Sequence, residues 1–226
     1  ACLPIHRQAG NRRGEAVTLN NLGLAHLGMR GFERRAIEYF TSAAAIWTGL
    51  GMELEGALAQ GNMACAELGL ADRLAEDGHH GDAQAALQRA MEAAVQACER
   101  AAREDVPRVA IDARIALARA CCGLGRQADA LRHFDEAALR LARHPSAELQ
   151  AEHLIGLGQC RCGTGEAAVA IEHLQAAERL ARDRQLPVHR ARALKSLAAA
   201  HERAGDLAQS LAAYRAFHVL TEQLRD

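Results

Sequence analysis

The clearest pattern in this chain is an apolar stretch at helical spacing, a glycine, and a second apolar stretch, repeated at a fixed interval. Gly125, Gly165 and Gly205 lie 40 residues apart, and each is flanked by apolar residues that recur on one helix face. Glycine accepts the left-handed conformation that ends a helix. Repetition at this interval is typical of stacked arrays of helix pairs. The pattern therefore predicts an array of helix–turn–helix units.

The same plan along the chain predicts about five helix pairs, over residues 14–48, 53–104, 107–143, 147–184 and 187–224. Pro107, Pro145 and Pro187 fall at joints between pairs, where a residue without an amide hydrogen ends or begins a helix. We expect Ser146 and Asp206 to cap the helices that follow them.

Two parts of the array depart from this regular plan. The second pair is predicted to have a longer first helix, over about residues 53–76, and a wide turn over residues 77–82. Residues 1–9 read as the tail of an earlier helix, and the apolar spacing continues into the last residues. We therefore expect residues 1–226 to form a single array that is a fragment of a larger protein.

The repeats resemble the tetratricopeptide repeat (TPR) family, which has a Leu-Gly or Leu-Ala pair, a turn glycine, and then a small, a large and a small residue. The fourth pair matches at Leu157-Gly158, Gly165, Ala170, Leu174 and Ala177, and the third at Leu117-Ala118, Gly125, Ala130, Phe134 and Ala137. The second pair matches less well, with Gly81 as its turn glycine and Ala90 in place of the large residue. The resemblance implies an all-α, right-handed superhelical solenoid.

A second resemblance concerns the context of the array. The link at residues 10–16 and the ending at residues 213–218 resemble arrays of bacterial signalling proteins, including those before a diguanylate or adenylate cyclase domain. Similar arrays occur in transcriptional regulators. This resemblance implies a regulatory or sensory module of a bacterial signalling protein, with any catalytic output domain outside this segment.

Composition supports the all-α class and narrows the partners. Half of the 226 residues are apolar and only 3% are aromatic, which disfavours strands. The 27 basic and 28 acidic residues give a net charge of −1, so nothing resembles a nucleic-acid-binding footprint or a polybasic membrane patch. No apolar run reaches the roughly 18 to 20 residues of a membrane span. Seven cysteines at mid-helix positions fit a reducing, cytoplasmic setting.

Candidate chemistry is sparse. Cys160 and Cys162 are two residues apart on one helix, so their thiols point about 200° away from each other and cannot grip one ion. No phosphate-binding loop, Ser-His-Asp arrangement or paired carboxylate stands out. Trp47, near the end of a helix, is interpreted as a packing residue rather than a stacking platform. We expect no metal, no cofactor and no enzymatic activity in this segment.

In TPR proteins the first helix of each pair lines the concave face, and the resemblance implies a ligand groove there. The outward positions of these helices are the candidate ligand-binding residues: Asn20, Leu24, Ile115, Arg119, Ile155, Gln159, Arg192 and Lys195. The expected partner is a protein or peptide. Two alternatives stay open: a scaffold that homodimerises through its end repeats, and a small-molecule sensor with a closed pocket near Met63 and Leu70 in the long second pair.

Overall fold

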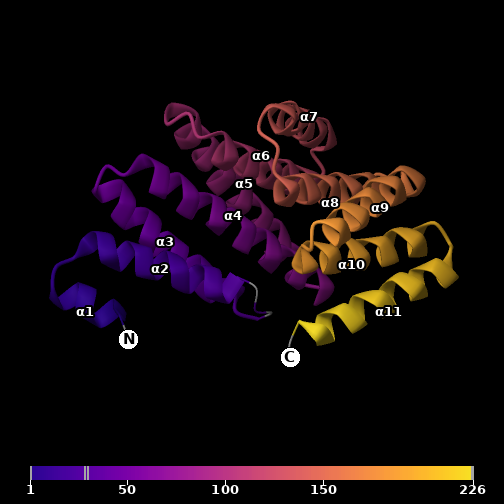
Figure 1. Cartoon of the computed structure of the whole chain (residues 1–226), viewed down its shortest axis with the longest axis horizontal. Coiled ribbons are helices and arrows are strands. Elements are labelled where there is room, and N and C mark those ends of the chain that lie inside the picture. Colours follow the sequence, from indigo (N-terminus) through magenta and orange to yellow (C-terminus); the bar gives the residue numbers. More distant parts are fainter. Residues whose placement is uncertain (1, 28, 30, 225–226) are drawn as a thin grey trace. The chain divides into compact units, whose positions relative to one another are not determined.

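The computed structural model describes residues 2–27, 29 and 31–224, and every regular element among them is an α-helix (Figure 1). The all-α class is confirmed. By their packing the residues divide into two compact units, 1–124 and 125–226. The expectation that residues 1–226 form a single array stays a prediction.

The helices follow the predicted pairs closely. The first unit contains α1 (Cys2–Gln8), α2 (Arg12–Leu27), α3 (Glu33–Gly49), α4 (Glu53–Glu76), α5 (His80–Arg103) and α6 (Pro107–Gly123). The second contains α7 (Gln127–Arg143), α8 (Ala147–Gly163), α9 (Ala167–Asp183), α10 (Pro187–Arg203) and α11 (Leu207–Gln223). The pairs are α2–α3, α4–α5, α8–α9 and α10–α11, and within each unit every helix packs on its neighbours in the chain. The unit boundary divides the predicted pair 107–143, since α6 and α7 belong to different units.

Turn glycines mark the junction inside each pair. Gly125, Gly165 and Gly205 have φ of 75°, 84° and 80°, in the left-handed region that favours glycine. In the second pair the residue with this conformation is Gly78, at φ 81°, whereas Gly81 lies inside α5. The choice of Gly81 as the turn glycine was therefore wrong by three residues.

The corrected register turns the irregular second pair into a regular repeat. Counted from Gly78, the pair before the turn is Leu70-Ala71, and the small, large and small positions are Ala83, Leu87 and Ala90. Leu70, Ala71 and Ala83 are buried in one cluster, with Leu87 packed against it. Ala90 thus fills the second small position, not the large one, and the second pair follows the same plan as the pair α8–α9.

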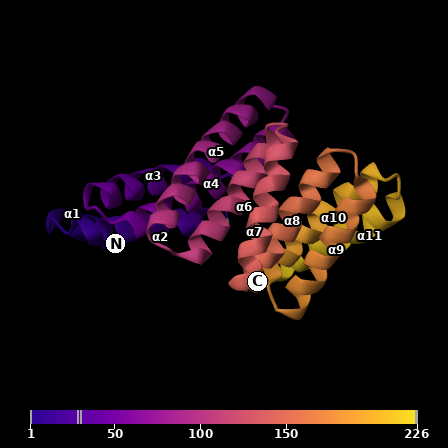
Figure 2. The same ribbon diagram turned by 90° about the horizontal axis from the view of Figure 1, so that it is seen from above.

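The second pair differs in length, not in plan. α4 and α5 have 24 residues each, whereas α6 to α11 have 17 each. Because the turn is regular, the extra two turns of helix lie at the far ends, near residues 53–59 and 97–103. α4 and α5 pack against each other along their length (Figure 2).

Small residues allow the two helices of a pair to approach closely. A Cβ on Gly158 would lie 2.6 Å from Cγ of Leu174, and a Cβ on Gly23 would lie 2.5 Å from Cε1 of Phe40. Real Cβ atoms do not approach that closely, so an alanine at either glycine would force the large residue that crosses the first helix to shift. Leu174 and Phe40 are both fully buried. This close fit explains the alternation of small and large residues that identifies the repeat.

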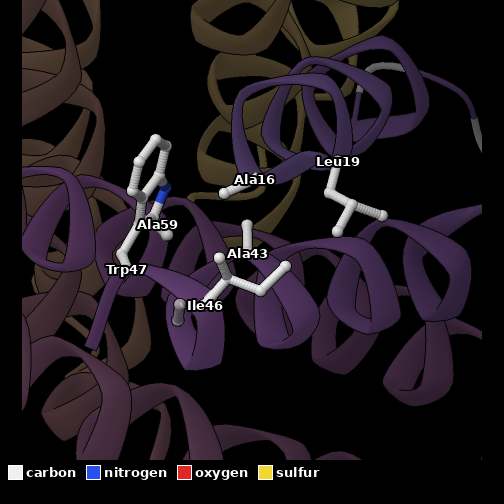
Figure 3. Packing of buried hydrophobic residues seen from close by; sticks show 7 residues of the cluster. Ala16, Leu19, Ala43, Ile46, Trp47 and Ala59 are labelled. Carbon is white, nitrogen blue, oxygen red and sulfur yellow. The ribbon is translucent and has the colours of Figure 1, made fainter. Parts of the chain in front are cut away.

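Trp47 is a packing residue, as predicted. Its side chain is 3% exposed and lies in a cluster with Ala16 and Leu19 of α2 and Ala59 of α4 (Figure 3). Ala59 belongs to the extra turns of α4, so this indole ties the lengthened pair to the first one. Such aromatic burial is a large contribution to the core of a chain with few aromatic residues.

The helix ends are stabilised as the sequence predicts. The Ser146 hydroxyl accepts a hydrogen bond from the amide of Leu149 at 3.4 Å, and the Asp206 carboxylate accepts one from the amide of Gln209 at 3.1 Å. Pro107 and Pro187 occupy first-turn positions of α6 and α10. None of the described helices is both long enough and apolar enough to cross a bilayer.

Candidate functional site

The first helices of the pairs share one partly exposed face, defined by the residues that lie thirteen and six positions before the turn glycine. We call this the open face of each unit. In the first pair the turn is one residue longer, so the corresponding residues lie fourteen and seven positions before Gly31. The open face of the first unit comprises Val17, Leu24, Cys65, Asp72, Asp112 and Arg119, and that of the second Glu152, Gln159, Arg192 and Ala199. We include in the first unit's face Asn20, Leu58 and Asn62, which lie three or seven residues from Val17 or Cys65 on the same helices.

In the first unit, polar side chains link successive first helices across the open face. The Asn62 amide of α4 donates a hydrogen bond to the Asn20 carbonyl oxygen of α2 at 3.2 Å. Arg119 of α6 and Asp72 of α4 approach to 3.9 Å. Exposed apolar side chains flank the two asparagines: Val17 and Leu24 on α2 and Leu58 on α4 are each between 43% and 45% exposed. The face therefore combines paired carboxamides with accessible apolar surface.

The open face of the second unit is also crossed by polar side chains of successive first helices. Arg192 of α10 forms an ion pair with Glu152 of α8, and the Gln159 amide donates to the Ser196 hydroxyl at 2.9 Å. His189 lies 3.9 Å from Glu152. Burial lowers the pKa of His189, and the nearby Arg192 charge lowers it further, against the opposing effect of Glu152. His189 is therefore mainly neutral near pH 7, and Arg192 is a permanently charged partner of Glu152.

The structure separates the predicted site residues into two groups. Leu24, Gln159 and Lys195 are exposed, and Asn20, Arg119 and Arg192 are partly exposed. Ile115 and Ile155 are 1% and 0% exposed, so the prediction that they face outward was wrong. Whether the other six residues bind a ligand stays a prediction.

The physical reason lies in how pairs stack. Ile115 and Ile155 lie ten positions before the turn glycine, at the same register as the buried Leu68. In the second unit the side chain at this register faces the next first helix, and Ile155 packs with Ala193 of α10. Lys195 occupies the same register but is exposed, because among the described residues α10 is the last first helix.

Sequence reasoning missed several residues of the open face. Val17 and Glu152 were recoverable, because counting from the turn glycine gives their register directly. Asn62 and Leu58 were not, since the turn of their pair was placed at Gly81 instead of Gly78. Their role is visible only once the register of α4 is known.

A separate groove of about 430 Å³ lies between α3 and α5, with α4 as its floor. Its lining residues are Arg34, Ile37, Glu38, Glu67, Leu70, Leu74, Asp82, Ala85 and Arg89. The expected closed pocket near Met63 and Leu70 is found only in part. Leu70 lines this groove, but its walls carry exposed side chains, and Met63 packs instead against Phe40 and Ala66.

The remaining histidine and cysteine candidates make ordinary packing contacts. The His153 ring donates from Nε2 to the Phe134 carbonyl oxygen at 3.0 Å, and burial lowers the pKa of this histidine. The Cys160 thiol donates to the Gln127 side-chain oxygen at 3.2 Å. Across the described part of the chain, no three His, Cys, Asp or Glu side chains are placed to hold a metal ion.

Comparison with known proteins identifies the class of fold. No family model and no curated protein matches the chain. Among solved structures, a Rap protein complexed with competence and sporulation factor matches with a TM-score of 0.78 and 15% identity, over 94% of this chain and 56% of that one. Aspartyl phosphate phosphatase F from Bacillus subtilis matches with a TM-score of 0.67 and 16% identity, over 99% and 55% of the two chains.

A third similar structure consists of TPR-like repeats of a kinesin light chain. The TPR-like repeats of a putative kinesin light chain from Podosopora anserina match with a TM-score of 0.57 and 16% identity, over 92% of this chain and 95% of that one. The chain therefore has the TPR-type helical repeat fold, as the sequence predicted. It spans little more than half of the Rap and phosphatase F chains, and at these identities the similarity concerns the fold alone.

Proposed function

We propose that this chain is a non-catalytic regulatory or sensory module that binds an extended peptide or a segment of a partner protein. The observation that carries the proposal is the open face of the first unit, where the Asn20–Asn62 carboxamide pair is flanked by Val17, Leu24 and Leu58. A carboxamide both donates and accepts hydrogen bonds, which matches the alternating groups of a peptide backbone. The neighbouring apolar side chains would receive alternate side chains of the same peptide.

The similarity to bacterial structures supports the signalling context. The Rap structure is a complex with competence and sporulation factor, and its similarity extends over 94% of this chain. We propose that the module belongs to a cytoplasmic bacterial signalling protein, and the resemblance of residues 213–218 to arrays that precede cyclase domains supports a cyclase or another output domain as the part it regulates. Because each repeat contacts only its neighbours, a bound ligand can bias the packing of adjacent pairs.

Selection of peptides tests this function directly. A display library of random-sequence peptides is selected on the full chain, and the affinity of the best binder is measured by calorimetry. Asn62→Ala should weaken binding about tenfold, because the variant loses hydrogen bonds to the peptide backbone. Gln88→Ala removes an exposed carboxamide from α5 and is the matched control. Failure to select any peptide, or equal affinity for Asn62→Ala and the unmodified chain, would refute the proposal.

A second candidate function, self-association, is favoured by one feature of α11. None of its residues is buried, and Leu207, Leu211 and Tyr214 form a stripe with 69%, 50% and 49% exposure. At the register of Tyr214, α9 has Leu174, which is fully covered by the next pair. We propose that a second copy covers the stripe. Light scattering should then show mass rising with concentration and a monomer for Leu211→Lys; a monomer at every concentration would exclude the dimer.

A further inference from the structure

The groove between α3 and α5 carries charges that the repeat plan does not require. Glu67 on its floor is 3% exposed and accepts two hydrogen bonds from Arg89, at 2.8 Å from Nε and 3.0 Å from Nη2. At the register of Glu67, α8 and α10 carry Leu154 and Leu194. Burying a carboxylate where a leucine would serve costs free energy, so this pair is retained at a cost to stability.

The buried carboxylate fixes the orientation of Arg89. Two of its three guanidinium nitrogens are bound to Glu67, while about half of the side chain remains exposed. The pairing with Glu67 also raises the pKa of Arg89, so its charge is permanent. A guanidinium held in this way keeps one face in the groove with little loss of side-chain entropy on binding.

The groove walls present three further exposed charges, on Arg34, Glu38 and Asp82. Among the described residues, the side chains of Arg34, Glu38 and Asp82 form no hydrogen bond or ion pair, and all three are exposed. Arg34 and Glu38 lie on the α3 wall, and Asp82 lies on the α5 wall. Arg34 and Asp82 are three and four positions after their turn glycines, so they lie at the same end of the groove. Opposite charges thus face each other across the groove, beside an apolar surface formed by Ile37 of α3 and Leu70 and Leu74 of α4.

We propose that this groove binds a small zwitterion with an apolar body, an apolar α-amino acid or a short peptide with both termini free. The ligand carboxylate is held by Arg34 and the free edge of Arg89. Its ammonium group is held by Asp82 and Glu38. Its side chain lies on Ile37, Leu70 and Leu74. A volume of about 430 Å³ is in the range of small-molecule sites and holds either ligand. The site is separate from the open face of the first helices.

Calorimetry on the full chain tests the ligand class with four probes: L-leucine, L-leucyl-L-leucine, N-acetyl-L-leucine and L-leucinamide. The first two carry both charges, whereas the last two each lack one. We expect binding of leucine, the dipeptide or both, and at least about tenfold weaker binding of the two singly charged analogues. The stronger of the first two identifies the source of the ligand. No binding by either one, or equal binding of the capped analogues, would overturn the proposal.

Matched variants test the location. Arg34→Gln and Asp82→Asn should each weaken binding by at least about tenfold. Arg35→Gln changes the charge by the same amount on an exposed residue of α3 that does not line the groove, and it should bind as the unmodified chain does. Equal affinities for Arg34→Gln and Arg35→Gln would overturn the assignment. These residues lie outside the open face, so peptide binding there should be unchanged in both variants.

Discussion

Replacing Leu174 with alanine tests the packing rule that defines this fold. Leu174 is fully buried against Gly158, at a contact too close to admit even a Cβ on the glycine. Its removal forfeits about 1.5 to 3 kcal/mol of side-chain burial and leaves a cavity, for a total of about 3 to 4 kcal/mol. Tyr214 occupies the same register in α11 but is 49% exposed, so Tyr214→Ala should cost about 1 kcal/mol or less.

Urea unfolding followed by far-UV circular dichroism measures both losses. The midpoint of the transition should fall much further for Leu174→Ala than for Tyr214→Ala. Hydrogen exchange locates the effect, and we expect faster exchange of amides in α8 and α9 of the leucine variant. Equal destabilisation by the two substitutions, or a larger loss at Tyr214, would refute the claim that the next pair covers this register in the array interior.

Three further predictions concern the turns, the groove and the histidines. Gly165→Ala should lower the free energy of unfolding by about 1 kcal/mol or more, because alanine is strained at φ 84°, whereas Gly163→Ala, with open space around its Cβ, should be neutral or stabilising in urea unfolding. Arg89→Ala should lower the free energy of unfolding by about 3 kcal/mol, because it leaves a buried carboxylate unpaired. Combining Glu67→Leu with Arg89→Ala should recover most of this loss, and a double variant as unstable as Arg89→Ala would contradict the expectation. Burial lowers the pKa of His153 below 6.5, so the unfolded chain binds more protons than the folded one as the pH falls. The contribution of this histidine to stability should therefore be complete above about pH 6.5 and decline below it. An unfolding midpoint that rises on acidification would contradict this expectation.

The helix pairs could be predicted because their signals are local. A turn glycine, a capping residue and apolar spacing act within one pair, so Gly165 and Ser146 were assigned from their neighbours alone. The second pair offered two glycines, Gly78 and Gly81, in one short segment. Local sequence does not choose between them. The choice depends on which register brings Leu70 and Ala71 against Ala83, and that is a contact between helices.

The candidate site was predictable only in part, for a similar reason. Helical periodicity shows that Ile155 and Gln159 lie on the first helix of their pair and point away from its second helix. It does not show which of them the next pair covers. Stacking buries Ile155 and leaves Gln159 exposed, and the same rule leaves Lys195 exposed at the register of Ile155. The closed pocket expected near Met63 and Leu70 corresponds in part to the groove between α3 and α5, which Leu70 lines. The charged residues of this groove follow from no repeat pattern.

Peptide binding by the open face of the first helices can be observed by hydrogen exchange of the full chain with and without a selected peptide. We expect slower exchange in α2 and α4, around Asn20 and Asn62, when the peptide is bound. Protection confined to α3 and α5, or no change in α2 and α4 at saturating peptide, would contradict it.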